Sequence, residues 1–230
     1  MLVCADIPEL REMLTFLGAE CLFIAKNGIL PDPVADHADM LCYAADERTG
    51  FSYDISLIET LNGRERAYRL PAEPLGGKYP GDVRLNCLRL GKKLIANTKY
   101  CSKDVLCDAE KRGMDIIHVN QGYARCSTLA VTDNAVITAD DGIAAALERS
   151  GVEVLKIRPG HINIPRYEYG FIGGAGARIS AGGIDMILFY GDPQTHPDGR
   201  RIIDFIDGHG LSVYCSGNHE LTDFGSCVEV

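Results

Sequence analysis

Short hydrophobic runs recur along the chain, separated by polar turns and by stretches with helical spacing. The pattern is clearest in the middle of the sequence, where it predicts two strands joined by a hairpin, then a helix, then a third strand. There the strands are expected at residues 125–131, 135–138 and 152–157, the turn at 132–134, and the helix after Asp140 or Asp141 with Ile143, Ala146 and Leu147 on one face.

The same unit is predicted in three other parts of the chain. In one, strands at 83–90, 94–96 and 114–119 flank a turn at 91–93 and a helix capped by Ser102. In another, strands at 177–180, 184–190 and 211–215 flank a turn at 181–183 and a helix bearing Ile202 and Ile206. A weaker copy has strands at 40–45 and 51–55, a turn near Gly50 and a short helix before Gly63.

Glycines mark the last strand of each unit. Five of them, Gly18, Gly63, Gly113, Gly151 and Gly210, each open a similar short strand, and four follow a stretch with helical spacing. A glycine in the left-handed region is a common helix end. A supersecondary unit repeated every 46 residues or so indicates a propeller or another repeat architecture.

The two ends of the chain complement each other. Residues 2–4 form a predicted strand followed by a helix with Leu10 and Leu14 on its apolar face, but this unit lacks its first strand. Residues 225–230 supply such a strand. Joined, they make a fifth unit, and a ring closed in this way leaves no open sheet edge.

We therefore predict an α/β fold in which five strand-strand-helix-strand units form one domain over residues 1–230. Alternating strands and helices would also suit a doubly wound parallel sheet. The tight hairpin within each unit argues against that alternative, because it requires antiparallel pairs.

Composition limits the kind of partner. The net charge of −9 disfavours nucleic acid and anionic membranes, and no run of hydrophobic residues is long enough to span a bilayer. Nine cysteines scattered through hydrophobic runs indicate reduced thiols and a cytoplasmic protein without a signal peptide. Cys215 and His219 have no second pair at metal-ligand spacing, so we expect neither a metal site nor a cofactor.

The five-unit pattern resembles the pentein, or guanidine-modifying enzyme, fold. The segments VNQGYARC, GFIGGAGARIS and LTDFGSC are similar to those of a bacterial family of uncharacterised penteins. The resemblance implies a five-bladed α/β propeller with a central channel. In its enzymes a late cysteine attacks an electrophilic carbon, a histidine moves protons, and carboxylates bind the planar cation.

Carried to this sequence, the resemblance implies Cys227 as nucleophile and His161 as its partner. The candidate residues for binding the substrate are Asn163, Glu168, Asp223, Glu220, Asn120, Tyr123 and Arg125. Cys42, Cys87 and Cys126 also lie in strands that open a blade, so a buried structural thiol is an alternative for Cys227. The chain also departs from the enzymes at Tyr123 and Tyr169.

Two functions are compatible with these residues: an enzyme acting on a C–N centre, and a ring that binds a metabolite or a protein without chemistry. We expect residues 158–169 to carry the site, because the connection is long and is stiffened by Pro159 and Pro165. The run 170–177 lacks the spacing of a phosphate-binding loop, so its glycines are expected to allow close packing at the ring axis.

Overall fold

A computed structural model describes all residues from 1 to 230, and its strands form five separate three-stranded sheets. The strands are β1 (Leu2–Ala5), β2 (Cys21–Ile24), β3 (Cys42–Ala44), β4 (Thr49–Ser52), β5 (Ala67–Arg69), β6 (Leu88–Leu90), β7 (Lys93–Ala96), β8 (Asp115–His118), β9 (Thr128–Thr132), β10 (Ala135–Thr138), β11 (Glu153–Lys156), β12 (Gly176–Ala181), β13 (Ile184–Asp192), β14 (Ser212–Glu220) and β15 (Cys227–Glu229). In each sheet the middle strand pairs antiparallel with one neighbour and parallel with the other, as the hairpins predict.

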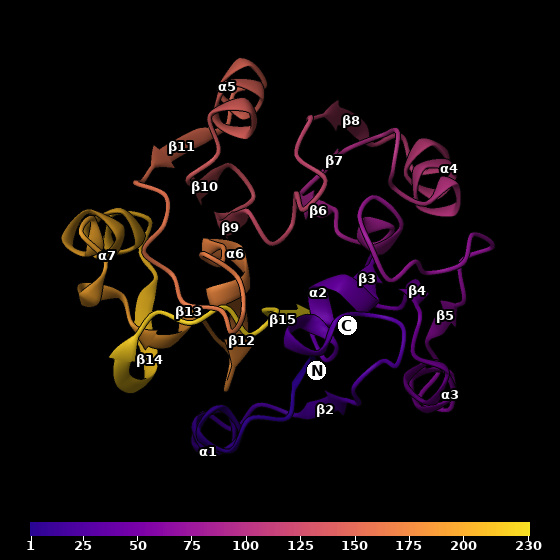
Figure 1. Cartoon of the computed structure of the whole chain (residues 1–230), viewed down its shortest axis with the longest axis horizontal. Coiled ribbons are helices and arrows are strands. Elements are labelled where there is room, and N and C mark those ends of the chain that lie inside the picture. Colours follow the sequence, from indigo (N-terminus) through magenta and orange to yellow (C-terminus); the bar gives the residue numbers. More distant parts are fainter.

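One helix joins the middle and last strand of each sheet. These helices are α1 (Pro8–Phe16), α3 (Ile55–Asn62), α4 (Lys103–Lys111), α5 (Asp141–Arg149) and α7 (Gly199–Gly208). Side-chain caps fix three of the helix starts: Asp54, Ser102 and Asp140 each accept a hydrogen bond from a backbone N–H in the first turn. Figure 1 shows the five helices at the periphery and the strands β3, β6, β9, β12 and β15 nearer the centre.

The predicted closure of the ring is confirmed. β15 pairs antiparallel with β1, placing Cys4 opposite Cys227, and the Val230 N–H donates to the Met1 carbonyl at 2.9 Å. The two chain ends lie close together near the centre in Figure 1. The ring of five units predicted from the repeat is therefore correct, and its fifth unit is built from both ends of the chain.

Several predicted boundaries are wrong. The strand expected at 40–45 begins only at Cys42, because Ala38–Leu41 form the short helix α2. Likewise, the strand expected at 83–90 is shorter than predicted: residues 81–83 form the 3-10 helix η2, and only β6 is strand. The turn of the first hairpin precedes Gly50, which lies inside β4, where a side chain would overlap Tyr43 and Tyr68. Of the helix-ending glycines, Gly63 keeps right-handed backbone angles.

The glycines of the predicted packing segment do pack at close quarters. The short helix α6 (Ile172–Ala175) lies against β9, and a Cβ at Gly173 would overlap the carbonyls of Arg125 and Thr128. The remaining short helices are η1 (Asp32–Val34) and η3 (Pro193–Thr195). None of the helices has the length and hydrophobicity needed to cross a bilayer.

Candidate functional site

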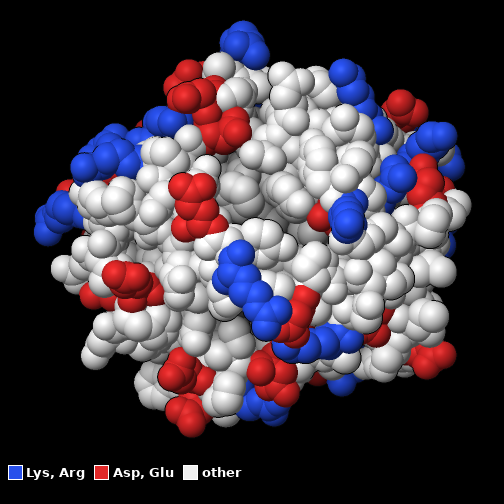
Figure 2. Space-filling view, in the orientation of Figure 1, with Lys and Arg blue, Asp and Glu red and all other residues white.

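A cavity of about 310 Å³ lies where the chain enters the innermost strands. We call it the acidic cavity, and it is lined by Val34, His37, Met40, Asp82, Tyr123, Cys126, Ile164, Tyr167, Glu168, Tyr169, Gly170, Phe171 and Asp223. Its members precede the inner strands β3, β6, β9, β12 and β15, so every unit of the ring contributes. Figure 2 shows the face seen in Figure 1 hollowed near its centre, with mostly uncharged residues around the depression.

The turn before β15 holds the carboxylate of Asp223 in this cavity. One oxygen of Asp223 accepts from the Phe171 N–H at 2.9 Å, and the other accepts from the Gly225 N–H at 3.1 Å. His37 Nδ1 lies 3.7 Å from Asp223 Oδ1, and both side chains are buried. A Cβ at Gly174 would overlap this carboxylate, so the glycine of α6 is what leaves room for it.

Cys126 reaches the same cavity and is held by a buried amide. The thiol donates to Asp39 Oδ2 at 2.9 Å and accepts from Asn86 Nδ2 at 2.8 Å. Asn86 Oδ1 in turn accepts from the backbone N–H groups of Arg125 and Cys126 at 3.0 and 3.2 Å. The position of the sulfur is thus fixed by residues from three units.

The buried carboxylates have few internal partners. Asp39, Asp82 and Asp223 are 1%, 5% and 4% exposed, and Oδ1 of Asp39 and of Asp82 has no hydrogen-bond partner. Asp82 Oδ2 accepts from the Tyr123 hydroxyl at 2.8 Å. A buried carboxylate oxygen without a hydrogen-bond partner lowers the stability of the fold, and a ligand that donates a hydrogen bond to it offsets that cost.

Burial dominates the proton affinities here. It raises the pKa of Asp223 to about 6; His37 opposes this shift and the charge of Asp39 adds to it. Burial also raises the pKa of the Cys126 thiol well above its usual value, and the charges of Asp39 and Asp223 act in the same direction. In the free protein Cys126 is therefore a thiol, with carboxylates close enough to accept its proton.

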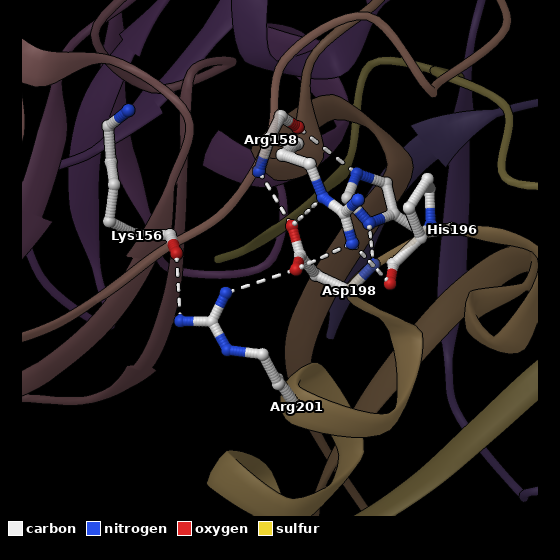
Figure 3. Close-up of polar contacts among 6 residues, drawn as sticks. Lys156, Arg158, His196, Asp198 and Arg201 are labelled. Atoms are coloured by element: carbon white, nitrogen blue, oxygen red, sulfur yellow. Dashed lines mark hydrogen bonds and ion pairs between the residues drawn. The ribbon is translucent and has the colours of Figure 1, made fainter.

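The long connection at 158–171 forms one wall of the cavity and is anchored at its start. The buried Asp198 carboxylate accepts from the Arg158 backbone N–H at 2.8 Å and from Arg158 Nε at 3.1 Å, and Arg201 Nη1 donates to it at 3.0 Å (Figure 3). His196 Nδ1 accepts from the Asp198 N–H, and its Nε2 contacts the Arg158 carbonyl. Both contacts suit a neutral imidazole, whose pKa is lowered by burial.

His161 does not reach either Asp223 or Cys227 from this connection. The connection is extended next to Thr222, so Ile162 and Ile164 point inward, 6% and 7% exposed, whereas His161 and Asn163 alternate with them and face solvent. The His161 ring packs edge-on against His196, with centroids 5.4 Å apart. The predicted pair of His161 and Cys227 therefore gains no support from the geometry.

Cys227 lines a second cavity, of about 220 Å³, together with Arg125. We call it the basic cavity, and it is lined by Cys42, Tyr43, Ala44, Cys87, Arg89, Leu90, Gly91, Arg125, Ala130, Asp133, Arg178, Cys227, Val228 and Glu229. These residues lie along the inner strands and at their carboxyl ends. The two cavities therefore occupy opposite ends of the ring axis, and the consecutive residues Arg125 and Cys126 face different ones.

The other predicted binding residues divide as follows. Tyr123, Glu168 and Asp223 line the acidic cavity, whereas Asn163, Glu220 and Asn120 are exposed and line neither cavity. Prediction of the site missed Asp82 and Cys126, which line the acidic cavity, and Asp39, which accepts from the Cys126 thiol. Their shared position, in a segment that leads into an inner strand, is the sequence signal that would have grouped them.

Comparison with known proteins places the chain in a family. Residues 5–228 match the model of a family of unknown function (DUF6873). The sequence matches no curated protein.

Solved structures share the arrangement at low identity. A dimethylarginine dimethylaminohydrolase adduct with S-methyl-L-thiocitrulline aligns with a TM-score of 0.56 at 10% identity, covering 90% of this chain and 78% of that one. SxtG, an amidinotransferase from Microseira wollei, aligns at 0.57 and 10% identity over 96% and 79% of the two chains. A substrate-bound agmatine deiminase from C. jejuni aligns at 0.52 and 12% identity over 99% and 92%.

At this identity the similarity establishes the fold and leaves the chemistry to the site. The chain has the pentein fold and belongs to the family of unknown function DUF6873.

Proposed function

We propose that the acidic cavity binds a small molecule carrying a planar cationic C–N group, guanidino or amidino, and that the protein is an enzyme acting on that group. One observation carries the proposal: buried carboxylates, a histidine and a thiol from different units of the ring converge on one cavity. The solved structures of the same fold include an amidinotransferase and an agmatine deiminase, which agrees with this class of substrate.

Charge and shape favour a planar cation. A guanidinium presents N–H donors in a fixed fork, which matches carboxylate oxygens in bidentate pairs. Asp82 and Asp223 offer such oxygens from two different units of the ring, and Asp82 Oδ1 has no internal partner. The rings of Tyr123 and Phe171 are stacked with centroids 6.0 Å apart and supply an aromatic wall on which a planar cation can lie.

The nucleophile that the cavity favours is Cys126. Its thiol proton passes to Asp39, and the sulfur forms a bond to the central carbon of the cation while electrons move to a nitrogen. Protonation of that nitrogen by the neighbouring His37 allows the C–N bond to break and the amine to leave. The oxygen of a water then bonds to the carbon and one proton of the water returns to His37. The C–S bond breaks, the sulfur regains its proton from Asp39, and the product leaves with a C=O bond while the second proton of the water passes to the released amine. The incoming cation itself favours the thiolate, because it offsets the carboxylate charges that raise the pKa of Cys126.

Cysteine substitutions test this assignment. Cys126→Ser should abolish turnover of guanidino or amidino compounds and leave their binding measurable by calorimetry, whereas Cys42→Ser, outside the acidic cavity, should retain activity. Cys227→Ser decides between the two candidate nucleophiles. Activity that survives Cys126→Ser but is lost in Cys227→Ser would transfer the role to Cys227, and activity surviving both would remove the cysteine mechanism.

A binding ring without chemistry is the second candidate, and the raised pKa of Cys126 favours it, because a thiol is a weak nucleophile. Alkylation by iodoacetamide at neutral pH separates the two. The enzyme predicts that methylguanidinium speeds the labelling of Cys126 specifically, by raising its thiolate fraction. Equal or slower labelling of Cys126 with saturating methylguanidinium favours the binding ring.

A further inference from the structure

We propose that the basic cavity is a second binding site, selective for a small organic carboxylate, at the opposite end of the axis from the acidic cavity. Three guanidinium groups reach it from three units of the ring: Arg89 on β6, Arg125 just before β9, and Arg178 on β12. A site formed by separate units at the axis is what a ring of repeats is built to provide.

The three arginines differ in whether they have a carboxylate partner within the chain. Arg178 is committed to internal partners, with Asp133 at 3.4 Å and Asp185 at 2.8 Å. Arg125 and Arg89 form no ion pair within the chain. In the basic cavity of a protein with a net charge of −9, two guanidinium groups therefore remain available to an external anion.

Arg125 is held in place for such a partner. Its Nη2 donates to the Cys227 carbonyl at 2.9 Å and to Ser226 Oγ at 3.3 Å, which fixes the guanidinium on β15. Its Nε and Nη1 donate to no protein acceptor. A guanidinium has five N–H donors, so Arg125 keeps N–H groups that can each donate singly to an oxygen of an anion.

The remaining lining sets the size and charge of the ligand. Asp133 is occupied by Arg178, and Glu229 lies at the outer end of β15 and is exposed. Against three arginines, these two carboxylates leave a positive lining that attracts an anion. The cavity is also lined by Cys42, Cys87 and Cys227. A cavity of about 220 Å³ suits a short mono- or dicarboxylate of which one end meets Arg125 and the other meets Arg89.

Calorimetry with succinate, and with chloride at matched ionic strength, tests the proposal on the full chain. Succinate should bind the native protein, and Arg125→Gln and Arg89→Gln should each weaken its binding by about tenfold or more. Arg149→Gln, at the exposed end of α5 and away from both cavities, is the matched control and should bind normally. Inorganic phosphate should bind more weakly than succinate.

Three results would overturn the proposal: no succinate heat beyond that of chloride with the native protein, normal binding by both cavity variants, or phosphate binding tighter than succinate. If Arg125→Gln unfolds because its bonds to β15 are lost, Arg89→Gln, which makes no such bond, decides alone. Methylguanidinium affinity is measured on the same variants. It should be unchanged in Arg89→Gln, so that failure here is distinguishable from failure at the acidic cavity.

Discussion

The two ends of the ring axis are built from the same repeated unit and yet differ in almost every property. The acidic cavity is formed by the segments that precede the inner strands, and it gathers buried carboxylates and aromatic rings. The basic cavity is formed by the strands themselves and by their carboxyl ends, and it gathers arginines. In a repeat fold, therefore, the connecting segments vary independently of the strands and can give one end its own chemistry.

The divergence is sharpest at β9, where one bond separates the two environments. Arg125 enters the basic cavity, Cys126 enters the acidic cavity, and Asn86 binds the backbone N–H of both. The two residues lie in the turn that leads into β9, where the Thr128 N–H donates to the Arg125 carbonyl, and this turn sends their side chains to different ends of the axis. Variants that affect one cavity and spare the other test this difference, and the largest effect is expected where both cavities depend on the same strand.

Deleting residues 227–230 should destabilise the whole ring and so remove the acidic and the basic cavity together. β15 closes the ring, and Cys227, Val228 and Val230 are 1%, 6% and 4% exposed. Loss of their burial and of the pairing with β1 should cost about 5 kcal/mol or more. Thermal unfolding followed by circular dichroism measures the effect. A truncated protein with an unchanged melting temperature would show that the termini do not close a cooperative ring.

Gly174→Ala should damage the acidic end alone. Its new Cβ would overlap the Asp223 carboxylate, which has to move or lose its hydrogen bonds to Phe171 and Gly225. We expect a cost of about 1 to 3 kcal/mol and loss of methylguanidinium binding, with succinate binding retained.

Gly208→Ala is the matched control for that substitution. It lies at the end of α7, where a Cβ meets no other atom within 4 Å, and alanine there should be neutral or stabilising by up to about 1 kcal/mol. Both variants are compared by chemical denaturation and calorimetry. Equal behaviour of the two glycines would mean that Asp223 is not held as the structure shows.

Acidification should weaken the acidic end selectively. The pKa of Asp223 is raised to about 6, so the carboxylate takes up a proton as the pH falls through 6 and loses its attraction for a cation. Methylguanidinium affinity should therefore fall between pH 7 and pH 5, and Asp223→Asn should show weak binding with a flatter profile.

The same shift has the opposite sign for stability. A carboxyl whose pKa is higher in the folded state favours folding when protonated, so its contribution is present below its unfolded pKa and is lost as the pH rises through 6. As the pH rises from 4 to 6, the free energy of unfolding of the native protein should fall relative to that of Asp223→Asn. Parallel unfolding curves for the two proteins across that range would exclude the shift.

The sequence was sufficient for the ring and insufficient for the site, for physical reasons. Periodicity, the caps at Ser102 and Asp140 and the complementary ends report local backbone preference, and local preference defines the units. The site depends on which way a few side chains point at the axis, and the short helix α2, which carries the Asp39 that accepts from Cys126, is not predicted: its last two residues are expected to be strand. Asp223, Tyr123 and Glu168 were predicted because they belong to segments that enter the channel.

The smallest effect is expected at His161, the residue on which sequence and structure differ most. Its side chain is exposed and packs on His196, away from both cavities, because it alternates with the buried Ile162 and Ile164. His161→Ala should change stability by no more than about 0.5 kcal/mol and leave methylguanidinium affinity and any turnover unaltered. His37→Ala, at the Asp223 pair, should by contrast reduce both affinity and turnover. If His161→Ala abolished turnover while His37→Ala did not, the connection at 158–171 would have to fold over the axis during the reaction, and the site would be the one that the sequence pattern predicted.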